Sequence, residues 1–376
     1  MSARLPGTVL LALLWACSSE GSGASDGLEM ADGADGRAPM TSTDAPAPAA
    51  GMDTAPAADP DPSAAEPGAG DDPTPTDGAP TSGGRGCDDP DPAWLLCEDF
   101  EDYAGDWDSW FESAPWLEAT GGDDRGRITM DSEHVHGGEY AVKMPAAAES
   151  GYQGGALFWW ACDGEQRTGC PLRSYETLYF RTWLRFAEDH EYVHHFLTIK
   201  GSRPDDFWDH GTAGCHPNGS LDMSTVVDFR EGSHETFFYA YHLDMQCDAN
   251  CGNYTDVAAV CDECAGKGLP TCEQQPQCCW GDNLEPETPA ALPVGQWTCL
   301  EMTMTANTPG EHDGSMAYWI DGELGHRVDG MLWRTDPELS LNRVRLMHYI
   351  ASGDADRSNV VWFDDVVVST EPIGCD

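Results

Sequence analysis

Residues 296–370 contain four consecutive runs with strong β-sheet character: WTCLEMTMTAN, AYWIDGELG, NRVRLMHYI and VVWFDDVVV. Each run alternates or is rich in β-branched and aromatic residues, and Gly, Pro, Asn or Asp bounds each of them. This pattern predicts short antiparallel strands joined by turns and packed as a β-sandwich. The last run places Asp364 and Asp365 among apolar residues. The fold must therefore compensate paired carboxylates within a strand.

The clearest single strand is expected over residues 177–186. Alternation separates its two faces, with Phe180, Thr182, Leu184 and Phe186 on one side and Tyr179, Arg181, Trp183 and Arg185 on the other. Trp and guanidinium groups together can stack a sugar ring and hold its carboxylate or hydroxyls, so we predict Tyr179, Trp183 and Arg185 as substrate-binding residues. In the structural alternative the arginines form ion pairs and Trp183 lies beneath a loop.

Two more expected strands carry aromatic and titratable side chains. Strict alternation over residues 194–200 places His194 and Lys200 on one face, the candidate substrate face, and His195 on the other. The run FFYAYHLD contributes Tyr239 and Tyr241. Alternation does not decide which side of this run faces a substrate, and we predict Tyr241 as a binding residue.

Several of these segments together resemble a known superfamily. GQWTCLEMTMTANTPGEHDG, AYWIDG and VVWFDDVVV, with CEDFEDY and LYFRTWLRF, resemble the jelly rolls of the concanavalin A-like lectin/glucanase superfamily. Within it they are most similar to polysaccharide-lyase-like members. The resemblance spans most of residues 87–376 and implies an all-β antiparallel jelly roll that recognises an extracellular polysaccharide.

The lyase resemblance implies β-elimination on a uronic-acid glycan. This reaction needs a base for the proton α to the carboxylate, a cation that stabilises the enolate-like charge, and an acid for the leaving oxygen. We expect Arg181 to neutralise the carboxylate, His194 or Tyr239 to be the base, Tyr239 or Tyr241 to be the acid, and Lys200 to assist electrostatically. Each residue also has a structural interpretation as a strand bridge or an ordinary sandwich aromatic.

The resemblance also implies a structural calcium ion. In similar jelly rolls, carboxylates of the first and last strands often bind Ca²⁺, and the matching positions here are Glu98, Glu101, Asp364 and Asp365, with Asp99 as a further candidate. Hard oxygen ligands from distant chain segments suit this ion. The alternative is that these carboxylates cap turns or pair with arginine.

Two other functions compete with elimination. A retaining glucanase needs two carboxylates close together on one strand face, and the acidic cluster in CEDFED fits calcium better. A non-catalytic carbohydrate-binding or adhesion module needs no acid and base, and it accounts for the abundance of Trp and Tyr. A structural surface protein that presents a Cys-rich insertion to a protein partner is a third class.

The N-terminus reads as an export signal. Residues 1–17 contain Arg4, an apolar run and the sequence LWAC, which fits a bacterial lipobox with Cys17 as the lipidated residue; the alternative is a plain signal peptide. Residues 18–86 are rich in Ala, Pro, Gly, Asp, Ser and Thr and predict a disordered acidic tether. We expect an exported bacterial lipoprotein on the outer membrane or cell surface, in contact with a membrane only through its lipid.

The remaining cysteines all follow residue 86, at positions 87, 97, 162, 170, 215, 247, 251, 261, 264, 272, 278, 279, 299 and 375. This even number in an exported domain predicts a disulfide framework, in which Cys87 or Cys375 staples a terminus to a neighbouring strand. We expect a Cys-rich insertion at about residues 211–293. Its Cys261-x-x-Cys264 pair also suits zinc, as the alternative.

Charge limits the partners. The chain has 19 Lys and Arg against 66 Asp and Glu, a formal net charge of −47. This balance argues against nucleic acid and anionic membrane surfaces as partners. It also requires that any site for a polyanionic lyase substrate be a local basic patch.

Overall fold

The computed structural model describes residues 86–116, 118–120, 128–145, 153–163, 169–191, 193, 195–207, 214–230, 232–247, 264–266, 269, 279–350 and 359–375. The predicted signal peptide, its lipidation site Cys17 and the predicted tether up to residue 85 lie outside these ranges. Within them, no helix combines the length and apolar character needed to cross a bilayer.

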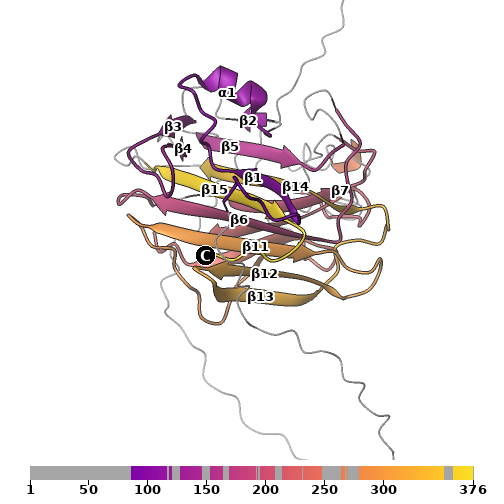
Figure 1. The fold of residues 1–376 in the computed structure, drawn as a ribbon. Coiled ribbons are helices and arrows are strands. Elements are labelled where there is room, and N and C mark those ends of the chain that lie inside the picture. Colours follow the sequence, from indigo (N-terminus) through magenta and orange to yellow (C-terminus); the bar gives the residue numbers. More distant parts are fainter. Residues whose placement is uncertain are drawn as a thin grey trace, which may run out of the picture. The chain divides into compact units, whose positions relative to one another are not determined.

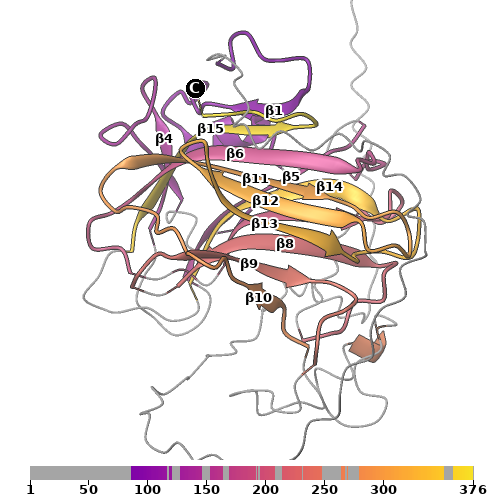
Figure 2. The same ribbon diagram turned by 90° about the horizontal axis from the view of Figure 1, so that it is seen from below.

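Two sheets contain the strands, and all pairings between these strands are antiparallel (Figures 1 and 2). Sheet A contains, in spatial order, β13 (Glu323–Met331), β12 (Gly314–Ile320), β11 (Trp297–Thr305), β6 (Thr177–Phe186), β15 (Val361–Ser369), β4 (Ala141–Met144) and β3 (Thr129–Asp131), with β1 (Trp94–Glu98) also paired to β15. Sheet B contains β10 (Asp282–Leu284), β9 (Thr236–Tyr241), β8 (Asp222–Phe229), β7 (His195–Ser202), β14 (Ser340–Ile350), β5 (Gln153–Trp160) and β2 (Glu118–Thr120). A short helix, α1 (Trp107–Ser113), follows β1. The all-β antiparallel sandwich is therefore confirmed.

The core lies between the two sheets and is built by alternation. Phe180 and Leu184 of β6 point into it from sheet A, and Ile199 and Val344 point into it from sheet B. All four side chains are fully buried in one continuous apolar cluster. Each strand therefore has one inner face and one outer face, and the outer faces of the two sheets point away from each other.

The WIDG segment forms the turn between β12 and β13. Ile320 pairs with Glu323, which leaves Asp321 and Gly322 as a two-residue loop with φ of 49° and 81°. Asp-Gly is favoured there because both positions need positive φ. The Asp321 Oδ1 accepts a hydrogen bond from the Cys299 N–H at 2.9 Å, which ties the turn to β11.

The disulfide framework is confirmed among the described residues. The bonds are Cys87–Cys97, Cys162–Cys170, Cys215–Cys264, Cys247–Cys279 and Cys299–Cys375. Cys264 is oxidised and is therefore not a zinc ligand, whereas Cys251, Cys261, Cys272 and Cys278 lie outside the described residues. The expected insertion at 211–293 needs a correction, because β8, β9 and β10 fall inside it and belong to sheet B.

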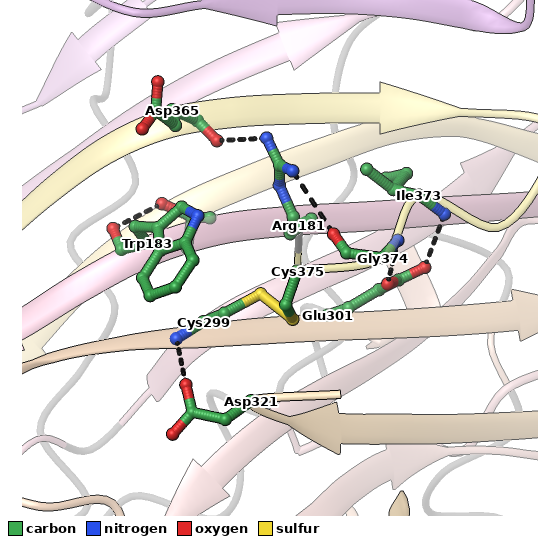
Figure 3. Close-up of a disulfide and its surroundings, with 10 residues drawn as sticks. Arg181, Trp183, Cys299, Glu301, Asp321, Asp365, Ile373, Gly374 and Cys375 are labelled. Carbon is green, nitrogen blue, oxygen red and sulfur yellow. Dashed lines mark hydrogen bonds between the residues drawn. A yellow bond between two sulfur atoms is a disulfide. The ribbon is translucent and has the colours of Figure 1, made fainter. Parts of the chain in front are cut away.

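A buried polar clamp holds the C-terminal segment on the outer face of sheet A (Figure 3). The Glu301 carboxylate of β11 accepts hydrogen bonds from Ile373 N at 3.0 Å and Gly374 N at 2.8 Å. Arg181 of β6 donates to the Gly374 and Asp365 carbonyl oxygens, both at 3.2 Å. The Cys299–Cys375 disulfide closes the same segment onto β11.

We expect Glu301→Ala to destabilise the fold strongly. The substitution leaves two backbone N–H groups without their acceptor and removes one of the two carboxylates, with Asp365, that act on the buried Arg181. Each buried donor left without an acceptor costs about 1–3 kcal/mol of unfolding free energy. Urea unfolding measures this loss, with the exposed Glu323→Ala of β13 as the control. Equal small losses in both variants would refute the clamp.

Three buried histidines, which belong to neither of the outer faces, form a hydrogen-bonded chain. The Nδ1 of His190 lies 2.8 Å from the Nε2 of His234, and the Nε2 of His190 lies 3.0 Å from that of His348. Phe186 and Phe229 pack against His190 and His234. Burial lowers the pKa of all three histidines, and that of His348 falls to about 3.

This histidine chain predicts a loss of stability in acid. Because the folded-state pKa of His348 is depressed from 6.5 to about 3, the unfolded chain binds protons first as the pH falls. The stabilising contribution is therefore complete above pH 6.5 and is lost progressively toward pH 3. In His348→Phe we expect the slope of unfolding free energy against pH below 6.5 to decrease by up to about 1.4 kcal/mol per pH unit.

The slope must be compared with that of the wild type. The pKa values of Glu98 and Asp364 are raised to about 7, so these two carboxyl groups increase the unfolding free energy as the pH falls, opposite to the histidines. An unchanged slope in the variant would show that the histidine chain does not contribute.

Candidate active site on the outer face of sheet B

Charged and phenolic side chains gather on the outer face of sheet B. We name as the sheet B cluster the residues Lys200 and His195 of β7, Arg343 and Arg345 of β14, Asp222 and Asp228 of β8, and Tyr239 and Tyr241 of β9. The neighbouring residues along these strands, such as Ile199, Val344, Val227 and Phe238, lie in the core. Alternation therefore turns the polar members outward.

Strand pairing aligns part of this cluster in two adjacent rows. One row runs across five strands through Trp160, Arg343, Lys200, Ser224 and Tyr241. The next row runs through Phe158, Arg345, Thr198, Val226 and Tyr239. An aromatic residue lies at one end of each row, followed by two cations in the first row and one in the second, and a tyrosine lies at the other end, with small side chains between them.

Aromatic rings and backbone carbonyls hold the two arginines. The guanidinium of Arg343 lies 4.6 Å from the centroid of the Trp160 ring and donates to the carbonyl oxygens of Asp206 and Phe207 at 2.6 and 3.0 Å. Arg343 is fully buried, and burial lowers its pKa to about 10, so it stays charged at neutral pH. Arg345 lies 4.9 Å from the Phe158 ring and is only half-buried, so its guanidinium is the more accessible of the two.

Lys200 supplies a third cation from the adjacent strand. Its Nζ lies 3.5 Å from an oxygen of Asp222, and only 6% of the lysine side chain is exposed. Burial lowers the pKa of Lys200, the nearby Arg345 lowers it further, and Asp222 opposes both effects. The pKa of Lys200 falls to about 7, and an approaching substrate carboxylate would raise it again and favour the charged ammonium.

Tyr239 and Tyr241 face each other at the opposite end of the two rows. Their hydroxyl oxygens lie 3.3 Å apart, and the Gly281 N–H donates to the Tyr239 oxygen at 2.9 Å. A Cβ at residue 281 would approach the Tyr239 ring to 2.7 Å, so glycine permits this close approach. Burial and the neighbouring Tyr241 raise the pKa of Tyr239 well above 10, so its hydroxyl keeps its proton at neutral pH.

His195 completes the cluster beside Tyr239. Its Nδ1 lies 3.0 Å from the Asp228 Oδ2, and its ring centroid lies 5.0 Å from that of Tyr239. Burial and the nearby Arg345 lower the pKa of His195 to about 4, so the imidazole is neutral at pH 7. The Asp228 carboxylate accepts a hydrogen bond from Nδ1–H, and in this tautomer the Nε2 atom carries the lone pair.

The arrangement provides the three functions that proton abstraction beside a carboxylate requires. The half-buried Arg345 and the desolvated Lys200 attract a carboxylate. A neutral imidazole accepts a proton, and a protonated phenol donates one.

The imidazole of His195 should titrate far below the ordinary histidine range, with a midpoint near pH 4. Arg345→Gln removes a positive charge that disfavours protonation and should raise this midpoint. NMR observation of the histidine ring protons measures both values. Arg230→Gln, at an exposed ion pair with Glu285, is the matched control. A midpoint that does not respond to Arg345 would show that the two groups are not coupled.

The structure brings together some of the predicted site residues and separates others. Lys200, Tyr239 and Tyr241 share the outer face of sheet B, as described above. Tyr179, Arg181, Trp183 and Arg185 lie on the outer face of sheet A, because they belong to β6. His194 lies outside the described residues.

The expectation that Arg181 joins Lys200 and Tyr239 in one patch is therefore wrong. β6 pairs with β11 and β15, whereas β7, the next strand, pairs with β8 and β14. The chain crosses between the sheets after Phe186, so equivalent outer faces of consecutive strands point in opposite directions. Arg181 instead anchors the C-terminal segment.

The structure also places Trp183 differently from the expected substrate platform. Its ring is stacked on that of His136 at a centroid distance of 3.8 Å and an interplanar angle of 13°. His136 belongs to the segment between β3 and β4, so the structural interpretation of Trp183 beneath a loop is correct.

The four predicted calcium ligands are occupied by separate hydrogen bonds. Glu98 accepts from Phe100 N at 2.9 Å, and Glu101 accepts from Glu139 N and Tyr140 N, also at 2.9 Å.

On the last strand, the Asp364 Oδ2 accepts from His136 N at 2.8 Å and Gly137 N at 3.2 Å, and its Oδ1 accepts from Asp365 N at 2.9 Å. Asp365 pairs with His136 Nδ1 at 2.6 Å. In the part of the chain that the structure describes, no group of three or more His, Cys, Asp or Glu side chains could hold a metal. The donor geometry does not fit a shared ligand set, and calcium stays a prediction.

Sequence reasoning missed five members of the sheet B cluster. Arg343 and Arg345 stand at alternating positions in NRVRLMHYI, the same signal that separated the faces of β6. His195 was expected on the inner face. It lies outward because Phe196 and Leu197 both enter the core, next to a register shift between Leu346 and Tyr349. For Asp222 and Asp228, alternation along β8 is the only sequence feature that could have placed them on the outer face.

Comparisons with known proteins show related folds only distantly. No protein-family model matches the chain, and no curated protein matches it. Among solved structures, it is similar to a marine alginate lyase from Aplysia kurodai (12% identity, TM-score 0.48), covering 74% of this chain and 99% of that one. It is also similar to an alginate lyase from a Chlorella virus (13% identity, TM-score 0.47, coverage 70% and 97%). A third is an endo-β-1,4-glucuronan lyase from Trichoderma reesei (15% identity, TM-score 0.43, coverage 74% and 96%). Similarity at this level assigns neither family nor activity.

Proposed function

We propose that this protein is a polysaccharide lyase that cleaves uronic-acid glycans by β-elimination on the outer face of sheet B. The observation that carries the proposal is the concentration of Lys200, Arg343 and Arg345 on two adjacent strands, opposite two tyrosines and a neutral histidine. In a chain of net charge −47, this is the local basic patch that a polyanionic substrate requires.

The sugar carboxylate binds at the cationic end of the two rows. Arg345 is the accessible guanidinium, and Lys200 lies on the neighbouring strand. Neutralising the carboxylate lowers the pKa of the adjacent C–H, because the negative charge that develops on deprotonation is then stabilised. The small side chains of Thr198, Ser224 and Val226 lie between this end and the tyrosines.

Proton transfers occur at the opposite end. The Nε2 of His195 removes the proton α to the carboxylate, and the electron pair of that C–H bond forms the new carbon–carbon double bond. The bond to the leaving glycosidic oxygen breaks, and this oxygen takes a proton from the Tyr239 hydroxyl. The opposite pKa shifts of His195 and Tyr239 supply a base and an acid at the same pH.

Glycoside hydrolysis fits the cluster less well. Asp222 and Asp228 are six residues apart on β8, so their backbones are about 20 Å apart along the strand. Paired glycosidase carboxylates are separated by only about 5–9.5 Å. Each aspartate is also paired, Asp222 with Lys200 and Asp228 with His195.

The test is an ultraviolet assay for the unsaturated uronate product with a panel of polyuronates. We expect Tyr239→Phe to lower kcat by at least about 100-fold, the usual contribution of one general acid. We expect Lys200→Met to lower it by about 100-fold or more, the usual contribution of one group that stabilises developing negative charge. Tyr179→Phe is the matched control, because it removes a half-buried tyrosine hydroxyl from the outer face of sheet A. Loss of activity in Tyr179→Phe with full activity in Tyr239→Phe would place the active site on sheet A and refute the site proposed on sheet B.

The same panel separates the alternative function. If no polyuronate yields the product while the protein is retained on an immobilised glycan, it is a non-catalytic carbohydrate-binding module. If neither product nor retention is found, the proposal of polysaccharide recognition fails.

We also propose an extracellular location. Five disulfides among the described residues are typical of a protein that matures in an oxidising compartment. Lipid attachment at Cys17 and anchoring at a bacterial surface are the finer part of this proposal and rest on the sequence of the first 17 residues.

A further inference from the structure

A second aromatic and cationic surface lies on the outer face of sheet A. Strand pairing aligns Trp297 of β11 with Arg185 of β6, Arg185 with Trp362 of β15, and Trp362 with Lys143 of β4. We call these four residues the outer row. Aromatic and cationic side chains alternate along it on four adjacent strands, and the inner neighbours Leu184, Val361 and Met144 lie in the core.

Arg185 has no acidic partner within the described residues. It forms none of the ion pairs found there, and its buried Nε has no hydrogen-bond partner. The chain has 66 acidic side chains against 19 Lys and Arg, so most arginines find a carboxylate easily. An unpaired guanidinium between two tryptophans is therefore a site that suits an external anion.

The other members of the outer row shape the surface around Arg185. Trp297 is partly exposed, whereas Trp362 is nearly buried beneath His134, whose ring stacks on it at 4.2 Å. Lys143 lies 5.7 Å from the Trp362 ring and is 33% exposed. The accessible groups are thus one indole, one guanidinium, one ammonium and one imidazole.

The acidic groups nearby are already engaged. Asp131 accepts from the Trp362 Nε1 at 3.0 Å and lies 3.5 Å from the Lys143 Nζ. Asp365 pairs with His136, and Asp364 accepts only backbone N–H groups. None of these three carboxylates pairs with Arg185, so its guanidinium is available to an anion from outside the protein.

We infer that the outer row is a second binding surface for the acidic polysaccharide, separate from the candidate active site and on the opposite sheet. A pyranose ring stacks on Trp297, and its carboxylate pairs with Arg185. Lys143 lies two strands further along, about 10 Å away, where it meets a later carboxylate of the same polymer. The choice of an acidic ligand rests on the proposed function, whereas the surface itself does not.

Such a surface would hold a polymer on the protein while another part of it reacts on sheet B. We assign it no chemistry, because none of the four residues of the outer row is a histidine or tyrosine that could act as base or acid. Its effect is to raise the affinity for long chains through two points of attachment.

The experiment is affinity electrophoresis in gels that contain sodium alginate or polygalacturonate, with dextran as the neutral polymer. All proteins carry Lys200→Met, so that the polymer is not cleaved during the run. We expect Arg185→Gln with Trp297→Ala to weaken binding of the acidic polymers by at least about tenfold, which is about 1.4 kcal/mol. Trp319→Ala is the matched control on sheet A, because its partner on β11 is the acidic Glu301.

Each outcome decides the inference. Binding of the double variant within about twofold of its parent would overturn it. If the double variant loses as much retardation in dextran gels as in gels with the acidic polymers, the surface does not select acidic ligands. The ultraviolet assay on the protein without Lys200→Met tests the proposed function separately. If that protein is a lyase but the outer-row substitutions do not change polymer binding, only this inference fails. If the substitutions weaken binding but no lyase activity is found, only the proposed lyase function fails. Thermal unfolding of each variant excludes misfolding as the cause.

Discussion

The packing of the inner faces of sheets A and B against each other is the interaction on which the rest of this structure depends. Residues from both sheets form one apolar core, and the inward positions of β6 and of β14 contribute fully buried side chains. Once the inner faces are committed to this core, alternation turns every second residue outward. Two polar surfaces result, and they point away from each other.

Low solvent exposure gives the outer face of sheet B its chemical character. Burial lowers the pKa of His195 to about 4 and raises that of Tyr239 well above 10, so each group is held in one protonation state at neutral pH. The three cations would be ordinary surface charges if they were solvated. Arg343 and Arg345 lose hydration because they pack against Trp160 and Phe158, and Lys200 loses it because only 6% of its side chain is exposed, which strengthens their attraction for an anion.

Charged groups that the fold buries elsewhere are compensated by the backbone. Asp364 accepts three backbone N–H groups and Glu301 accepts two, and both hold segments that connect or follow strands of sheet A. The sequence required such compensation for Asp364, and the resemblance to other jelly rolls suggested a metal. Backbone N–H donors meet part of the requirement, and burial with the neighbouring Asp365 still raises the pKa of Asp364 to about 7.

The amino-acid sequence by itself determined the strands and the two faces of each one. Residues 177–186 were predicted as a strand with the bounds that β6 has, and Phe180 and Leu184 were placed on its core face. Alternation is a local property, so it can be read without knowing the neighbours of a strand. It failed at His195, where two successive side chains enter the core.

Only the tertiary structure decided which outer faces share a side of the sandwich. Arg181 and Lys200 have the same outward position on consecutive strands, yet one lies in sheet A and the other in sheet B. Sheet membership depends on the pairing of β6 with β11 and β15 and of β7 with β14, and each of these partners lies more than 100 residues further along the chain. No local pattern records those pairings, so the cluster of Lys200, Arg345, His195 and Tyr239 becomes visible only when the sheets are assembled.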